Sequence, residues 1–257
     1  MQGVDPKDGN ALRTIAVELQ QKFFPGGLST RTQPPPKTSS EPKSESTVVN
    51  APLDFELKDL DAGHPYLAER GFTRDTGRHF GIGYCSRGVL KDRLAIPLHD
   101  HKGKLVGYAG RVVDDSSITE DNPRYRLPSR RERGGKVYEF RKSLFLYNGH
   151  RIKALSDDLI VVEGYPSVWW LTQHGFPWTV ALMGSDCSEE QAELIARLVK
   201  PSGRIWFMPD GDDAGERLAA SLLPRLTSSR FVRWIRLGEG RQPTDLPALT
   251  LKEYLVV

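Results

Sequence analysis

Three acidic residues follow predicted strands in the second half of the chain. Glu163 comes directly after the apolar residues 159–162, and Asp210 and Asp212 come after residues 204–208, which are apolar except for Arg204. Strands that alternate with helices predict parallel βαβ units, whose right-handed crossovers bring the strand carboxyl ends to one edge of a sheet. Carboxylates gathered there repel one another unless cations lie between them, and hard oxygen ligands suit Mg²⁺ or Mn²⁺. The pattern is typical of a centre for phosphoryl transfer.

A fourth acidic residue, Asp245, lies in a proline-containing loop after the predicted strand 231–237. Its place beyond a strand's carboxyl end would let it join the same cluster. A lone aspartate in such a loop is also a common helix cap. Both interpretations stay open from the sequence.

The elements that would position these carboxylates can be predicted from local signals. Pro166 suits the first turn of a helix after Glu163, because its missing N–H has no partner there in any case. Residues 178–183 form the second predicted strand, and Ser188 with Gln191 forms a capping box for a helix that ends at residue 199. A third helix is expected over residues 213–226.

Length and composition exclude several classes of protein. The chain has 257 residues and a net charge of +3, enough for one large domain or two modest ones. Its two cysteines, Cys85 and Cys187, lack the paired spacing of a zinc ribbon and predict no disulfide framework. No run reaches the roughly 20 apolar residues of a membrane span, and the N-terminus lacks an apolar signal core. We therefore expect a cytoplasmic protein without zinc.

The composition predicts four regions along the chain. Residues 1–28 hold a short helical remnant, and residues 29–52 are rich in Pro, Ser, Thr, Lys and Glu, which predicts a disordered linker. Residues 53–153 form an N-terminal lobe, with a helix near residues 64–70, a strand over 80–84, and a β-hairpin of residues 93–98 and 105–113. His99 and His101 are interpreted as solvated turn residues instead of metal ligands. Residues 154–257 form the domain with the acidic cluster.

A strongly basic block lies between residues 124 and 142. Tyr125, Tyr138 and Phe140 are interleaved with its cationic side chains, which are Arg124, Arg126, Arg130, Arg131, Arg133, Lys136, Arg141 and Lys142. Such a run is often only a solvated face. Cationic and aromatic side chains together also suit the phosphates and bases of a nucleic acid, and we favour that interpretation.

The motifs resemble those of a known family. Glu163-Gly164 and Asp210-Gly211-Asp212, in this order, resemble the Toprim fold. Residues 66–72, 80–84, 93–98 and 107–111 resemble the N-terminal lobe of the DnaG-type primase core. Residues 124–125 and 140–142, followed by 146–147, resemble its block that contacts nucleotide and template. The resemblance covers residues 60–247. It implies an α/β protein with an α+β N-terminal lobe and a Toprim-type, Rossmann-like parallel sheet.

The resemblance also implies an activity. The chain would be a DNA primase-like RNA polymerase, a nucleotidyltransferase that makes short RNA primers from ribonucleoside triphosphates on single-stranded DNA. Glu163, Asp210 and Asp212 would be catalytic, and together with Asp245 they would hold Mg²⁺ or Mn²⁺. The residues that would bind nucleotide or DNA are Arg93, Arg111, Arg124, Tyr125 and Lys142. A replicative helicase is left open as a further partner, and no membrane is expected.

Three departures from the family pattern bear on this expectation. Ser167 stands where the family has an aspartate, Gln242 and Asp245 stand where it has two aspartates, and the family's zinc ribbon is not found. A fragment, a zinc-less mobile-element variant and a weakened paralogue are all consistent with them. The alternative functions are a Toprim metal-dependent nuclease and a non-catalytic replication module that binds single-stranded DNA. The sequence gives no initiation preference and no oligomeric state.

Overall fold

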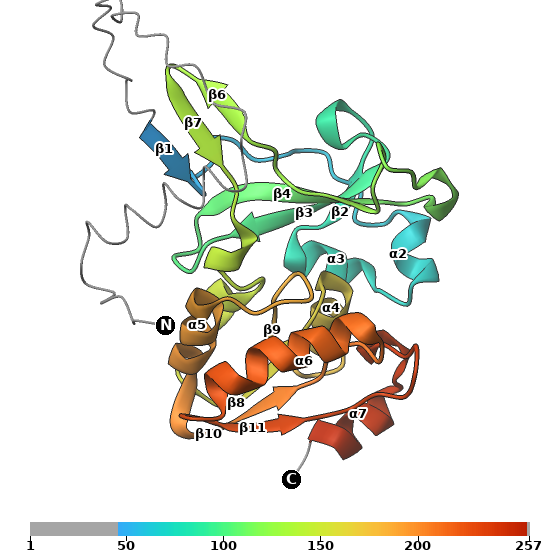
Figure 1. The fold of residues 1–257 in the computed structure, drawn as a ribbon. Helices are drawn as coiled ribbons and strands as arrows, with labels where there is room; N and C mark the ends of the chain where they lie inside the picture. Colours follow the sequence, from blue (N-terminus) through green and yellow to red (C-terminus); the bar gives the residue numbers. More distant parts are fainter. Residues whose placement is uncertain (1–45, 256–257) are drawn as a thin grey trace, which may run out of the picture. The chain divides into compact units, whose positions relative to one another are not determined.

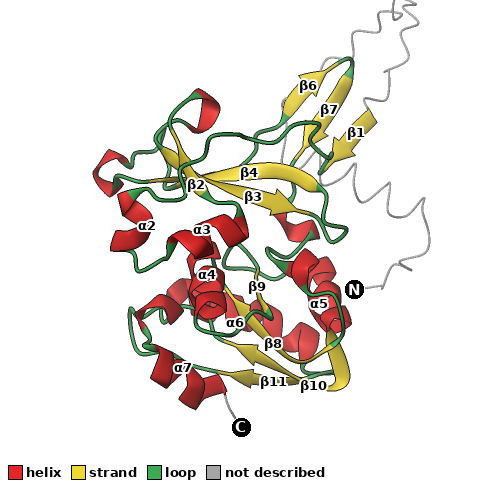
Figure 2. Cartoon of the chain, turned by 180° about the vertical axis from the view of Figure 1, so that it is seen from behind, coloured by secondary structure: helices red, strands yellow, loops and turns green. Residues whose placement is uncertain are grey.

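A computed structural model describes residues 46–255 of the chain (Figures 1 and 2). The helices are α2 (Pro65–Glu69), α3 (Arg74–Phe80), α4 (Tyr165–Gln173), α5 (Glu189–Leu198), α6 (Asp213–Leu226) and α7 (Ala248–Leu255). The strands are β1 (Ser46–Val49), β2 (Gly83–Cys85), β3 (Arg93–His99), β4 (Leu105–Val112), β5 (Tyr125–Arg126), β6 (Arg131–Arg133), β7 (Lys136–Glu139), β8 (Ser156–Val162), β9 (Thr179–Ala181), β10 (Val199–Phe207) and β11 (Phe231–Trp234). Short 3₁₀ helices are η1 (Gly88–Leu90), η2 (Asp115–Ser117), η3 (Lys142–Leu144), η4 (Gly149–Arg151) and η5 (Pro243–Asp245).

The C-terminal half contains a four-stranded parallel sheet in the order β11-β10-β8-β9. Alternate residues of each strand face opposite sides, so each face acquires its own apolar cluster. On one face Leu159 and Phe207 pack with residues of α5 and α6, and on the other Ile160 and Trp206 pack with residues of α4 and α7. Helices therefore cover both faces of this sheet (Figure 1). The predicted α/β fold class is confirmed.

The expected helix starts are also present in this half. Pro166 lies in the first turn of α4, and α5 begins with the capping box of Ser188 and Gln191. Helix α6 has the bounds expected for it, Asp213–Leu226.

The N-terminal lobe contains an antiparallel sheet in the order β2-β3-β4-β5. The predicted β-hairpin is present as β3 and β4, with Ala95 opposite Gly110. Helix α2 begins at Pro65, close to the predicted position. The lobe packs on α4, because the ring of Phe72 lies 5.4 Å from that of Trp169 and the Thr73 amide donates to Gln173 Oε1 at 2.9 Å.

Two predictions in this lobe are wrong. The strand expected over residues 80–84 is shorter, because Phe80 ends α3 and Gly81 caps that helix with a φ of 67°, so β2 begins only at Gly83. Helix α3 was not expected. His99 is not a solvated turn residue, because it ends β3, is half-buried and has its ring 4.5 Å from that of His150.

A third sheet has the order β1-β7-β6 (Figure 2). Strands β6 and β7 form an antiparallel hairpin from the centre of the basic block, and β1 pairs parallel with β7. This pairing corrects the expected linker, which was to reach residue 52, since Ser46–Val49 form a strand. The parallel pairing connects residues 90 positions apart, so no local sequence pattern predicts it.

The other expectations about chain organisation concern the N-terminal residues and the boundary between the two domains. The helical remnant of residues 1–28 and most of the linker of residues 29–52 lie outside the described residues. The boundary expected between residues 153 and 154 stays a prediction; it falls between η4 and β8. Over residues 46–255, none of the helices is both long and apolar enough to span a membrane.

Candidate active site

Glu163 and Asp210 follow neighbouring strands of the parallel sheet. Glu163 comes one residue after β8, and Asp210 comes three residues after β10. The two strands are hydrogen-bonded as far as the Met208 amide and the Val161 carbonyl, at 2.9 Å. Glu163 Oε2 and Asp210 Oδ1 are both buried and have no hydrogen-bond partner. Buried polar atoms without partners are costly, so this edge of the sheet is arranged for something other than stability.

The two carboxyl groups influence each other's ionisation. Burial, followed by the charges of Asp210 and Asp212, raises the pKa of Glu163 from its ordinary value of 4.5 to about 7. Burial, followed by the charges of Asp212 and Asp245, raises the pKa of Asp210 from 3.8 to about 6. Carboxylates crowded in this way ionise together more easily when a cation lies between them.

Asp212 and Asp245 both have local structural roles as well. Asp212 is the N-cap of α6, and its Oδ1 accepts a hydrogen bond from the Gly215 amide at 2.9 Å. Asp245 Oδ2 accepts from the Gln242 amide at 2.7 Å and closes the capping box of η5. The cap that the sequence allowed for Asp245 is therefore present. Its role as a metal ligand stays a prediction, although its charge reaches Asp210.

The donor set fits a divalent cation that prefers oxygen. Two buried carboxylate oxygens lack partners, and two more carboxylates lie near enough for their charges to raise the pKa of Asp210. Over residues 46–255, however, no three His, Cys, Asp or Glu side chains are close enough together to hold one ion. A metal ion here would be held by the pair Glu163 and Asp210, with water completing its coordination.

Backbone packing fixes the loop that carries Asp210. The Gly211 amide donates to the Arg241 carbonyl and the Gly240 amide donates to the Gly211 carbonyl, both at 2.8 Å. Gly215 in the first turn of α6 lies so close that a Cβ there would overlap the Asp210 carbonyl oxygen. The loop after β10, the loop after β11 and the start of α6 therefore hold Asp210 as one unit.

Besides Arg217, whose charge acts more strongly to lower the pKa of Glu163, the structure brings Lys142 to this edge. Its Nζ donates to the Met183 carbonyl at 2.7 Å, just beyond β9, and its charge acts to lower the pKa of Glu163. Tyr125 packs nearby, with its ring 5.6 Å from that of Tyr165 in the first turn of α4. Ser167, which the sequence placed one turn beyond Glu163, is buried with 5% of its surface exposed.

Arg93 and Arg111 are buried in the N-terminal lobe. Arg93 donates to the carbonyls of Gly110 and Pro123, each at 2.9 Å, and to the Asn122 side chain. Arg111 forms an ion pair with Asp115 at 2.5 Å. These partners favour structural roles, so contact with nucleotide or DNA stays a prediction for both.

Arg111 also stacks between two aromatic rings. Its guanidinium lies 5.3 Å from the ring centre of Tyr66 and 5.8 Å from that of Tyr125. Arg124, by contrast, is exposed. It is the one arginine of the predicted set that is free to meet a ligand without leaving a buried position.

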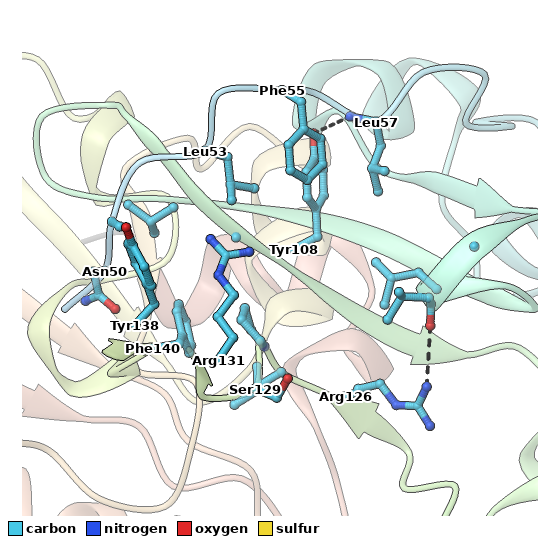
Figure 3. A pocket seen from close by; sticks show the side chains of 18 of the residues that line it. Asn50, Leu53, Phe55, Leu57, Tyr108, Arg126, Ser129, Arg131, Tyr138 and Phe140 are labelled. Atoms are coloured by element: carbon cyan, nitrogen blue, oxygen red, sulfur yellow. Dashed lines mark hydrogen bonds between the residues drawn. The ribbon is translucent and has the colours of Figure 1, made fainter. Parts of the chain in front are cut away.

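A cavity of about 680 Å³ lies in the N-terminal lobe (Figure 3). Its walls come from residues 50–57, the β2–η1 turn, β4 and the basic block. Leu53, Phe55 and Tyr108 give it an aromatic and apolar lining, while Arg126 and Arg131 lie along it. The guanidinium of Arg131 lies 5.4 Å from the ring centre of Tyr138. Sequence reasoning missed this cavity, and only Asn50 and Ala51 of its first wall fall within the expected linker.

Comparison with known proteins assigns the fold of both lobes. Residues 157–234 match the Toprim domain family. The DNA primase of Pseudomonas aeruginosa is 30% identical over 223 residues, which cover 70% of this chain and 32% of that protein. The DNA primase of Deinococcus radiodurans is 33% identical over 160 residues, which cover 61% of this chain and 26% of that protein. The chain thus spans about a third of the length of the curated relatives it matches.

Crystal structures of primases show the same architecture. A DNA primase domain from Pseudomonas aeruginosa is 29% identical, with a TM-score of 0.56, and the match covers 72% of this chain and 67% of that one. The DnaG primase catalytic domain bound to single-stranded DNA matches with a TM-score of 0.60 at 23% identity, over 75% of this chain and 70% of that one. Residues 157–234 thus match the Toprim domain, and the chain resembles the catalytic core of bacterial DnaG-type DNA primases.

Proposed function

We propose that this chain is the catalytic core of a primase-like nucleotidyltransferase. It would join ribonucleoside triphosphates into short RNA primers on a single-stranded DNA template. The observation that carries the proposal is the pair of buried, unpartnered carboxylate oxygens of Glu163 and Asp210 at the edge of the parallel sheet. The similarity of both lobes to primase cores supports it.

The acidic residues at this edge of the sheet would have different roles in the reaction. Glu163 and Asp210 would hold the divalent cation, with water as further ligands, and Asp212 and Asp245 lie close enough to contribute charge. When bound, Mg²⁺ or Mn²⁺ would neutralise the triphosphate and favour ionisation of the attacking hydroxyl group. The alternative role of Glu163 is to accept the proton of that hydroxyl group.

Basic and aromatic side chains would hold the template and the nucleotide. Lys142 reaches the acidic edge, and Arg124 is exposed beside Tyr125. The cavity of the N-terminal lobe offers aromatic walls for bases, and Arg126 and Arg131 would meet phosphates. The relative bound to single-stranded DNA supports such a partner.

An assay that distinguishes three outcomes tests this proposal. The protein is incubated with single-stranded DNA and labelled ribonucleoside triphosphates, with Mg²⁺, with Mn²⁺ or with a chelator. Labelled RNA that forms only with a divalent cation is the expected result. Cleaved DNA would identify a nuclease, and retention of intact DNA without either product would identify a binding module.

A further inference from the structure

Gly184 lies where the side chain of Lys142 meets the parallel sheet. A Cβ on Gly184 would overlap Lys142 Nζ and come within 3.4 Å of Lys142 Cε. The Lys142 ammonium therefore occupies the space that any other residue at position 184 would fill. The φ of Gly184 does not require glycine, since it is not among the positive values. Space for the lysine is the local reason for a glycine here.

The residue before Gly184 supplies the acceptor for this ammonium. Met183 is buried and has a φ of 63°, which is unusual for a residue with a side chain. Its amide donates to the Glu163 carbonyl at 2.8 Å, and its own carbonyl accepts from Lys142 Nζ at 2.7 Å. The turn after β9 thus links the lysine to the backbone of Glu163.

The backbone of Lys142 is held by the start of α5. Gln191 is 2% exposed, and its Nε2 lies within hydrogen-bonding distance of the carbonyls of Lys142, Phe145 and Leu182 at 3.4, 3.2 and 3.1 Å. Ser188 Oγ donates to the Ser143 carbonyl at 2.7 Å. The capping box therefore does more than begin a helix, because the same two side chains attach the segment that carries Lys142 to the sheet.

We propose that Gly184 and the Met183 carbonyl form a seat that positions the Lys142 ammonium beside Glu163, and that Gly184 is a positioning residue for nucleotide transfer. The catalytic consequence rests on the function proposed above. The seat itself is a property of the fold and can be tested without any activity. One N–H of the ammonium is used by Met183, which leaves the others for a phosphate of the nucleotide or template.

Gly184→Ala separates this role from general stability. The added methyl group meets the far end of a flexible side chain, so the lysine moves while the backbone stays. We expect the ammonium to leave the Met183 carbonyl and the free energy of unfolding in urea to change little. Ser185→Ala changes the next residue of the same turn and is the matched control.

The first measurement is the acylation rate of Lys142 by an amine-reactive ester at mildly alkaline pH, read by peptide mass spectrometry. The hydrogen bond to the Met183 carbonyl restrains the amine, so its loss in Gly184→Ala should speed labelling roughly tenfold. Ser185→Ala should label like the parent, and the exposed Lys136 should label equally in all three proteins. Equal labelling of Lys142 in the parent and Gly184→Ala would overturn the seat.

The second measurement is a double-mutant cycle on ribonucleotide incorporation. If Gly184 acts through Lys142, Gly184→Ala should lower incorporation in the parent and should cause no further loss in the Lys142→Ala background. Independent losses in both backgrounds would overturn its positioning role. If no protein of the set incorporates nucleotide, the proposed function fails, and the labelling experiment still decides whether the seat exists.

Discussion

Glu163 and Asp210 make the metal-free protein sensitive to pH. Their pKa values in the folded state, about 7 and about 6, lie above the ordinary values of 4.5 and 3.8. The folded state therefore binds more protons than the unfolded state between the two sets of values. The stability from this pair is complete below about pH 4 and is lost as the pH rises to about 7.

The size of this effect can be measured by urea unfolding at a series of pH values in the presence of a chelator. One pKa unit corresponds to about 1.4 kcal/mol, and we expect a loss of roughly 1–3 kcal/mol because the two groups titrate as a pair. Glu163→Gln should flatten the dependence. Parallel curves for the parent and Glu163→Gln would show that burial and mutual repulsion do not control this carboxyl group.

Substitution by alanine should lower the free energy of unfolding at Arg93 and leave it almost unchanged at Arg131. Arg93 is 2% exposed and donates to two backbone carbonyls that would lose a buried partner, so Arg93→Ala should cost roughly 2–4 kcal/mol of unfolding free energy. Arg131 is exposed on β6, so Arg131→Ala should change stability by about 0.5 kcal/mol or less.

The contribution of Arg131 to nucleic-acid binding can be measured from the salt dependence of the protein's affinity for single-stranded DNA. Arg131→Ala should lower the slope of log affinity against log salt by roughly the 0.7 expected for one phosphate contact on a single strand. A wild-type slope for Arg131→Ala would show that the β6–β7 hairpin is only a solvated face. A fully stable Arg93→Ala protein would contradict the structural role of Arg93.

At the scale of elements, the start of α6 and the loop after β10 depend on one close approach. A Cβ at Gly215 would overlap the backbone carbonyl of Asp210, and neither backbone can move cheaply. Gly215→Ala should therefore lower the free energy of unfolding by roughly 2–4 kcal/mol and displace Asp210 of the proposed metal site. Ala220→Gly, at an exposed position of the same helix, should cost only about 1 kcal/mol. Equal costs would mean that α6 tolerates displacement.

The elements that could be predicted are those with strong local signals. Short stretches of sequence are enough to recognise the capping box of α5, Pro166 in α4 and the apolar strand β8. Helix α3 was missed because its sequence, RDTGRHF, has a glycine in its centre and no apolar period. Strand β1 was missed because its stability comes from pairing with β7, far along the chain.

The sequence predicted the carboxylates of the candidate site but not the contacts of its basic residues. Strand connectivity alone brings Glu163 and Asp210 to neighbouring strand ends. The burial of Arg93 could not be read from sequence, since its acceptors include Asn122 and Pro123, in a loop distant along the chain. The seat of Lys142 depends on the positive φ of Met183, which no pattern of residues predicts.

At the scale of the whole described chain, one segment connects the basic block to the acidic edge. The Tyr147 amide donates to the Ala181 carbonyl of β9 at 3.0 Å, and its hydroxyl accepts from the Trp169 indole at 2.8 Å. Phe80 of the N-terminal lobe packs against the same two rings. The groups expected to bind nucleic acid and the carboxylates expected to bind metal are therefore held by one continuous core.

We propose that the carboxylates at the edge of the parallel sheet carry out metal-dependent nucleotide transfer. Incorporation of labelled ribonucleotides on single-stranded DNA, compared between the parent, Asp210→Asn and Asp212→Asn, is the decisive measurement. We predict that both variants lose incorporation at every Mg²⁺ and Mn²⁺ concentration. Asp210→Asn should stay folded or become slightly more stable, because one of the repelling charges is removed. Unchanged incorporation in both variants, or unfolding of both, would contradict the claim and show that these carboxylates are structural.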